Sequence, residues 1–114
     1  MAKVQLAALQ ALVDRLLADQ SAAGEIACKH FFSGAAAYVG GQIFMTLTPI
    51  GLALKLCERD RARLAALGAT PLRYFPNAPI KKDYVVLPET IASDDAALAP
   101  WARASMAFAT KSAD

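Results

Sequence analysis

The residue types that build metal sites are scarce in this sequence. Its 114 residues include two cysteines and one histidine. Cys28 and His30 share one face of an expected strand, and Cys57 is the remaining candidate ligand. A structural zinc site needs four ligands, usually from closely spaced cysteine pairs, and no fourth ligand is apparent. We therefore predict no bound metal, and we leave open a disulfide between Cys28 and Cys57, which nothing in the sequence supports.

The groups needed for catalysis are equally scarce. A nucleophile and its base must meet within hydrogen-bond distance, whereas Cys28 and His30, two residues apart on a strand, point in parallel. There is no second histidine and no pair of carboxylates in a recognisable frame. Gly40 and Gly41 lack the surrounding residues of a phosphate-binding loop. We predict a non-enzyme with no catalytic residues and no cofactor; a small enzyme or ligand-binding protein built around Cys28 and His30 is the most distant alternative.

Long apolar runs are also missing. Hydrophobic residues make up 56% of the chain, but no segment approaches the roughly 18 uninterrupted apolar residues of a membrane span. The apolar region after Lys3 is interrupted at helical spacing by Gln5, Gln10, Asp14 and Arg15, which indicates an amphipathic helix and not a signal peptide. We therefore expect no membrane partner, and a cytoplasmic location with both thiols reduced.

The region from Glu25 to Cys57 contains the clearest structural signals and predicts an antiparallel meander. Gly40-Gly41 separates two apolar runs, and glycine adopts the positive φ angles that a two-residue hairpin turn requires. Thr48-Pro49-Ile50-Gly51 is a second turn, with φ preset at Pro49 and Gly51 able to take the left-handed conformation. Between the two turns, side chains alternate with the period of a strand, Ile43, Met45 and Leu47 on one face and Phe44, Thr46 and Thr48 on the other.

The remaining elements are expected on both sides of this meander. We predict a helix over 2–19, strands over 25–32, 35–39, 70–75 and 82–87, a helix over 58–67 and a last helical region from about residue 93. Its start at Ser93–Asp95 offers capping oxygens. Because an interior proline costs a helix about 3 kcal/mol, we expect Pro100 to open the regular helix. Trp101 shares an apolar stripe with Leu98 and Phe108, and we expect it in the core.

With these elements placed, the sequence resembles a known family. The residues Lys29-His30-Phe31-Phe32-Ser33-Gly34 and Tyr38-Val39-Gly40-Gly41-Gln42-Ile43-Phe44 are similar to the K-x-M-F-G-G…Y-x-x-G-x-M-F pattern of TfoX N-terminal domains, the TfoX/Sxy-like competence regulators. The similarity continues through Leu54–Leu56, Leu67–Leu72, Tyr84–Glu89 and Trp101–Arg103, and covers about residues 5 to 110. Phe31 stands where methionine is usual, and Ser33 replaces the first glycine of the pair.

The resemblance implies a two-layer α+β fold, with an antiparallel sheet of about six strands in the order α-β-β-β-β-α-β-β-α and helices on one face. It implies one such domain over residues 1–114, and we expect the second, helical domain of full-length members to be absent. The family offers no catalytic residues. We predict a non-enzymatic regulatory or protein-interaction module, in transcription or competence, that binds another regulatory protein. We also predict that two copies pair into a homodimer through an unused sheet face or an edge strand.

Charge is unevenly distributed, although the net charge is only +2. Residues 55–82 hold seven basic residues against two acidic ones, whereas residues 83–114 hold five acidic residues against two basic ones. The basic set is Lys55, Arg59, Arg61, Arg63, Arg73, Lys81 and Lys82. Since clustered lysines and arginines contact phosphates, weak and salt-sensitive nucleic-acid binding is the alternative function. Arg59 and Arg63 share a helix face and Arg61 points elsewhere; without a recognisable nucleic-acid-binding motif, a solvated helix face is the favoured interpretation.

Overall fold

The elements of the protein follow the predicted order, with one additional short helix between the last strand and the last helix. The computed structural model describes residues 2–17, 26–31, 34–73 and 83–112. Its elements are α1 (Ala2–Leu17), β1 (Ile26–Phe31), β2 (Gly34–Val39), β3 (Gln42–Thr48), β4 (Gly51–Lys55), α2 (Glu58–Ala65), β5 (Thr70–Pro71), β6 (Tyr84–Val86), α3 (Glu89–Ala92) and α4 (Asp95–Ser112). The strand predicted over 70–75 is shorter, because Leu72 and Arg73 leave the sheet; Tyr74 and Phe75 lie outside the described residues.

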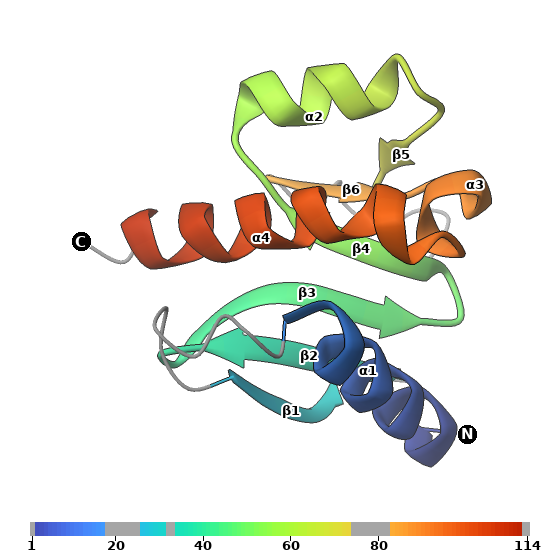
Figure 1. Ribbon diagram of the computed structural model, residues 1–114, viewed down its shortest axis with the longest axis vertical. Coiled ribbons are helices and arrows are strands. Elements are labelled where there is room, and N and C mark those ends of the chain that lie inside the picture. Colours follow the sequence, from blue (N-terminus) through green and yellow to red (C-terminus); the bar gives the residue numbers. More distant parts are fainter. Residues whose placement is uncertain (1, 18–25, 32–33, 74–82, 113–114) are drawn as a thin grey trace.

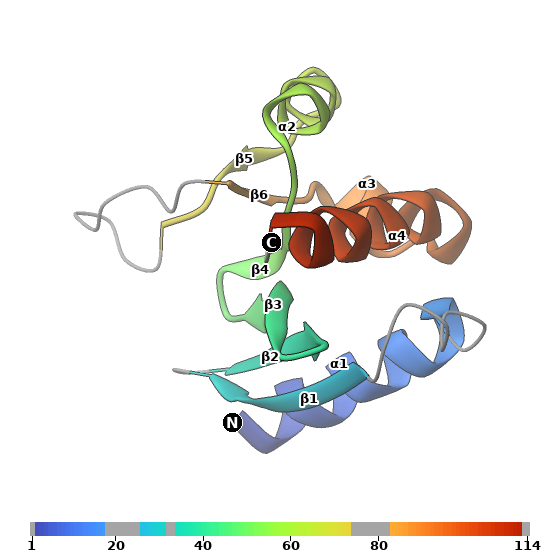
Figure 2. The same cartoon turned by 90° about the vertical axis from the view of Figure 1, so that its left-hand side faces the viewer.

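The strands form one open antiparallel sheet in the order β1-β2-β3-β4-β6-β5. Helix α1 lies over β1 and β2, and α4 lies along β3 and β4 (Figure 1). Figure 2 shows α2 and β5 at the opposite end of the molecule from β1. The α+β fold with helices packed on an antiparallel sheet is therefore confirmed.

Both predicted turns are present. Gly40 and Gly41 have φ angles of 56° and 84°, as a two-residue hairpin with a primed turn requires. Gly51 has a φ of 134° and ends the second turn, in which the Ile50 amide donates to the Thr48 hydroxyl at 3.2 Å. These turns determine the pairing of β2 with β3 and of β3 with β4.

Gly34, at the start of β2, is required for a different reason. A Cβ atom at this position would lie 2.1 Å from the Leu47 carbonyl oxygen and 2.8 Å from the Thr48 Cα atom. Both neighbours are backbone atoms of β3, so neither can rotate away. The closeness of β2 and β3 therefore excludes every side chain at position 34.

One core forms between the helices and the sheet. It contains leucines from α1, small and apolar residues from the strands, and the inner face of α4, including Leu9, Leu12, Leu16, Ala37, Val39, Phe44, Met45, Leu54, Leu98 and Met106. The buried Ser105 hydroxyl lies 2.7 Å from the carbonyl oxygens of both Phe44 and Lys55. Phe44 and Lys55 lie one residue beyond Met45 and Leu54, the last pair of the β3–β4 ladder, so Ser105 bridges the seam between the two strands where their pairing ends.

The predicted alternation of β3 is wrong at Ile43. Ala37 lies opposite Met45, but the next residue, Tyr38, lies opposite Ile43, so Phe44 is an extra residue in the strand. Such a bulge shifts the period of two, and Phe44 and Met45 both enter the core while Ile43 is not part of it.

The expectation that Pro100 opens the last helix is also wrong. Helix α4 starts at Asp95 and continues through Pro100. The predicted cap is confirmed, because the Asp94 carboxylate accepts hydrogen bonds from the amides of Ala96 and Ala97 at 3.1 and 3.3 Å. Pro100 provides no amide for the Ala96 carbonyl, but both residues are exposed, so water can solvate that carbonyl and the helix tolerates the loss.

Candidate functional site

Helix α2 presents three charged residues on one face. Its first turn is acidic, which suits the partial positive charge of a helix N-terminus, and Leu64 is its buried anchor. Arg59, Asp60 and Arg63 are spaced i, i+1 and i+4, so their side chains lie on neighbouring rows of the helix surface. All three line a surface hollow that faces α4.

Helix α4 supplies the other wall with the same spacing. Pro100, Trp101 and Ala104 line the hollow opposite α2. Trp101, expected in the core, is half-buried: it packs against the core and also lines this hollow. Pro100 and Ala104 have short side chains, and the indole lines the hollow between them.

The two walls are linked by the side chain of Arg63. Its guanidinium lies over the Trp101 ring, 5.2 Å from the centroid, and its Nη1 lies 3.7 Å from Asp60 Oδ1. Arg59 Nε lies 4.0 Å from the same oxygen. The Arg59 and Arg63 side chains are 83% and 64% exposed, whereas Asp60 is 14% exposed. The rim of the hollow therefore carries two guanidinium groups, and the Asp60 carboxylate lies deeper between them.

The predicted basic set separates into residues with different surroundings. Arg59 and Arg63 share a face, as predicted, and Arg61 points elsewhere: its Nε donates to the Leu56 carbonyl at 3.0 Å and its Nη2 to Asp83 at 3.5 Å. Arg61 thus joins the start of α2 to the residue before β6. The half-buried Lys55 ends β4 and the exposed Arg73 follows β5, while Lys81 and Lys82 lie outside the described residues.

Cys28, His30 and Cys57 do not form a shared site. Cys28 and His30 lie on β1, whereas Cys57 precedes α2 at the far end of the sheet. Both thiols are free, and burial, followed by the negative charge of Asp14, raises the pKa of Cys28. Within residues 2–17, 26–31, 34–73 and 83–112, no three metal-ligating side chains gather. A protonated, half-buried thiol is a poor nucleophile.

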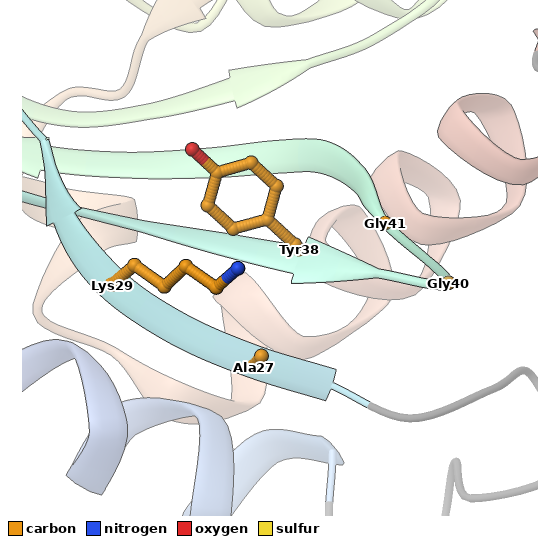
Figure 3. Close-up of a pocket in the computed structure, with 5 residues that line it drawn as sticks. All are labelled: Ala27, Lys29, Tyr38, Gly40 and Gly41. Atoms are coloured by element: carbon orange, nitrogen blue, oxygen red, sulfur yellow. The ribbon is translucent and has the colours of Figure 1, made fainter.

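A second hollow lies beside β1, β2 and the turn that follows β2. It is lined by Ala27 and Lys29 from β1, by Tyr38 from β2, and by the Gly40-Gly41 turn. The Lys29 ammonium lies 5.5 Å from the centroid of the Tyr38 ring, and the two side chains come from neighbouring strands (Figure 3). This surface offers one charged group, whereas the hollow between α2 and α4 offers three.

The sequence contains a spacing signal for this site that the distribution of charge does not reveal. Asp60, Pro100 and Ala104 were not predicted as site residues, and Trp101 was assigned to the core. The signal is the repeated i, i+1, i+4 spacing on two helices, but nothing in the sequence indicates that these two faces oppose each other. That arrangement depends on β6 lying beside β4, which places α2 near α4.

Comparison with known proteins identifies the family. None of the helices in the described part of the chain is both long and apolar enough to cross a membrane. No curated protein matches the chain. A family model described as the TfoX N-terminal domain matches residues 16–109, nearly the whole sequence. The resemblance seen in the glycine-turn and tryptophan motifs is thereby confirmed, and the chain belongs to the TfoX N-terminal domain family.

Proposed function

We propose that the protein is a non-enzymatic regulatory module, in transcription or competence, that acts by binding another protein. The observation that supports this most directly is the half-buried Trp101 held beside Arg63 where two helices meet. Tryptophan and arginine are the residue types most enriched at the energetic centres of protein interfaces. The family assignment supports the regulatory role, since the resemblance is to competence regulators.

Two further properties belong to this proposal. The raised pKa of Cys28 argues only against this thiol as a nucleophile, in line with the proposed absence of catalysis. The cytoplasmic location is supported by the two free cysteines, since reduced thiols are typical of that compartment.

Homodimer formation through an edge strand is also part of the proposal. The sheet has β1 at one edge and β5, with two residues, at the other. β1 has six residues and is therefore the longer edge for pairing with a second copy. Light scattering at micromolar concentration tests this, and a monomeric mass would contradict it.

Weak nucleic-acid binding remains the alternative, supported by the exposure of Arg59 and Arg63 on one face. The inward orientation of Arg61 weakens it, because one predicted phosphate contact is used inside the protein. A salt-titrated binding measurement with duplex DNA tests it. Equal binding by the wild type and by a Lys55→Glu, Arg59→Glu, Arg63→Glu variant would exclude the basic segment as the contact.

Affinity capture from native lysate, with mass-spectrometric identification, tests the main proposal. We expect the wild-type protein to retain a specific protein reproducibly and in proportion to the amount of bait. Failure to retain any protein above a bait-free control would contradict the proposal. Capture with an Arg59→Glu variant, with Arg103→Glu as the matched exposed arginine on α4, then shows whether the partner uses the hollow.

A further inference from the structure

We infer that the hollow between α2 and α4 binds an acidic segment of a partner protein that also carries a large apolar side chain. This inference rests on the proposed function and specifies the chemistry of the partner. The partner's carboxylates would contact the rim arginines Arg59 and Arg63, and its apolar side chain would lie against the exposed part of Trp101.

The charge of the hollow favours an anionic partner. Its lining carries two arginines and one carboxylate, and Asp60 lies deeper than either guanidinium. The Arg59 side chain is 83% exposed, and its contact to Asp60, at 4.0 Å, is too long for a hydrogen bond. A guanidinium has five N–H donors in a planar fork, a geometry that matches a carboxylate.

Arg63 is already held in place for such a contact. The Trp101 ring and the Asp60 carboxylate both restrain its guanidinium. Binding a long side chain normally costs conformational entropy, and contacts that already restrain the side chain lower that cost. The hydrogen-bonding capacity of Arg63 is not consumed by these contacts, because Nη1 lies 3.7 Å from Asp60 Oδ1.

The shape of the hollow favours a partner with an apolar side chain. Pro100 and Ala104 flank Trp101 with little bulk, so space remains next to the indole. Aromatic side chains contribute large apolar contact areas to interfaces. A purely acidic segment would leave this surface in water, and a purely apolar one would leave the two rim arginines with Asp60 as their one shared counter-charge.

The same features disfavour a nucleic acid as the occupant. Nucleic-acid affinity increases with the number of phosphates contacted, and this hollow offers two arginines. Arg61, the third arginine of α2, contacts the protein itself and therefore adds no phosphate contact to these two. We therefore assign a peptide segment, and treat oligonucleotide binding as an outcome that the test must distinguish.

Intrinsic fluorescence provides the test, because Trp101 is the single tryptophan of the sequence. The probe is a capped peptide Glu-Glu-Leu-Leu-Glu-Glu, which contains no fluorophore. We expect a saturable change in Trp101 emission that weakens with added salt. A lysine-for-glutamate peptide, a hexaglutamate peptide and an oligothymidylate should each bind more weakly.

Matched variants locate the contact. Arg59→Ala should weaken peptide binding about tenfold, the effect of losing one charge-assisted hydrogen bond. Arg103→Ala, an exposed arginine of α4 outside the hollow lining, should bind like the wild type. Unchanged binding by Arg59→Ala, or tighter binding of the oligothymidylate than of the peptide, would overturn the inference.

The outcomes separate this inference from the proposed function. A lysate partner captured equally by the wild type and by Arg59→Glu would support the interaction module but overturn the hollow as its site. If the partner is lost with Arg59→Glu but not with Arg103→Glu, and the peptide does not bind, the hollow remains the binding site. The inference that the partner segment is acidic and apolar is then overturned. Circular dichroism of each variant confirms that it is folded.

Discussion

The two ends of the sheet differ in how strongly they are packed. The meander β1–β4 has strands of five to seven residues, and α1 and α4 bury its apolar face. At the α2 end, β5 has two residues and β6 three, and α2 is anchored by Leu64 while Leu67 is 57% exposed. The comparison indicates that the meander supplies stability, whereas the thinly packed end exposes the arginines and tryptophan of the candidate site.

The largest effect is expected for Gly34→Ala, in the meander. The added Cβ would meet two backbone atoms of β3, so the strands must separate, and we expect about 3 kcal/mol or more of destabilisation. Urea unfolding followed by circular dichroism measures it. Gly40→Ala is the control: nothing lies within 4 Å, and only its positive φ matters, at about 1–2 kcal/mol. Equal destabilisation of the two variants would show that the close contact of β2 with β3 does not determine the cost of a side chain at position 34.

Leu64→Ala tests the α2 end. Truncating the buried anchor should cost about 2–5 kcal/mol. If this end is the weaker part, the emission of Trp101 in this variant should change at a lower urea concentration than the circular dichroism signal. Leu67→Ala, at a largely exposed position, should leave both transitions in place. Coincident transitions in Leu64→Ala would mean that both ends unfold as one unit.

Ser105→Ala tests the seam between β3 and β4. The hydroxyl has one proton, which the Phe44 and Lys55 carbonyls share, and its loss removes this donor at a cost of about 1–3 kcal/mol. Thermal unfolding measures the loss. Thr110→Ala is the matched control on α4, because the Thr110 hydroxyl donates to carbonyls of its own helix. A Ser105→Ala protein as stable as Thr110→Ala would show that the Ser105 hydroxyl does not stabilise the contact between β3 and β4.

Arg15→Ala should have the smallest effect. Arg15 Nε donates to the Asp95 carboxylate at 2.8 Å and joins α1 to α4, but both side chains are solvent-exposed. This hydrogen bond holds the pKa of Asp95 below its usual value. The stabilisation is therefore present at neutral pH and is lost as the pH falls through the pKa of Asp95 in the folded protein. Melting temperatures of the wild type and Arg15→Ala, measured from acid to neutral pH, should differ at neutral pH and converge in acid. Arg103→Ala is the control and should show no such pH-dependent difference from the wild type.

The sequence predicted what local residue chemistry decides. Gly40-Gly41 and Asp94 were placed correctly, because a hairpin turn and a helix cap depend on a few adjacent residues. The wrong alternation at Ile43 results from a bulge in the pairing of β3 with β2. The continuous helix at Pro100 depends on solvent exposure. Neither strand pairing nor exposure is a local property of the sequence. For the same reason the inward contact of Arg61 with Asp83 was not predictable from the basic cluster alone.

The order of the strands also determines how the protein is completed during synthesis. β6 lies between β4 and β5 in the sheet although it follows both in the chain. The outer edge of β4 therefore has no partner until residues 84–86 have left the ribosome. The apolar face of β3 and β4 is covered by α4, which follows both strands in the chain by about 40 residues or more. A nascent chain that has not yet extended past Asp95 exposes that face, so the strands depend on the later synthesis of α4 for protection against aggregation.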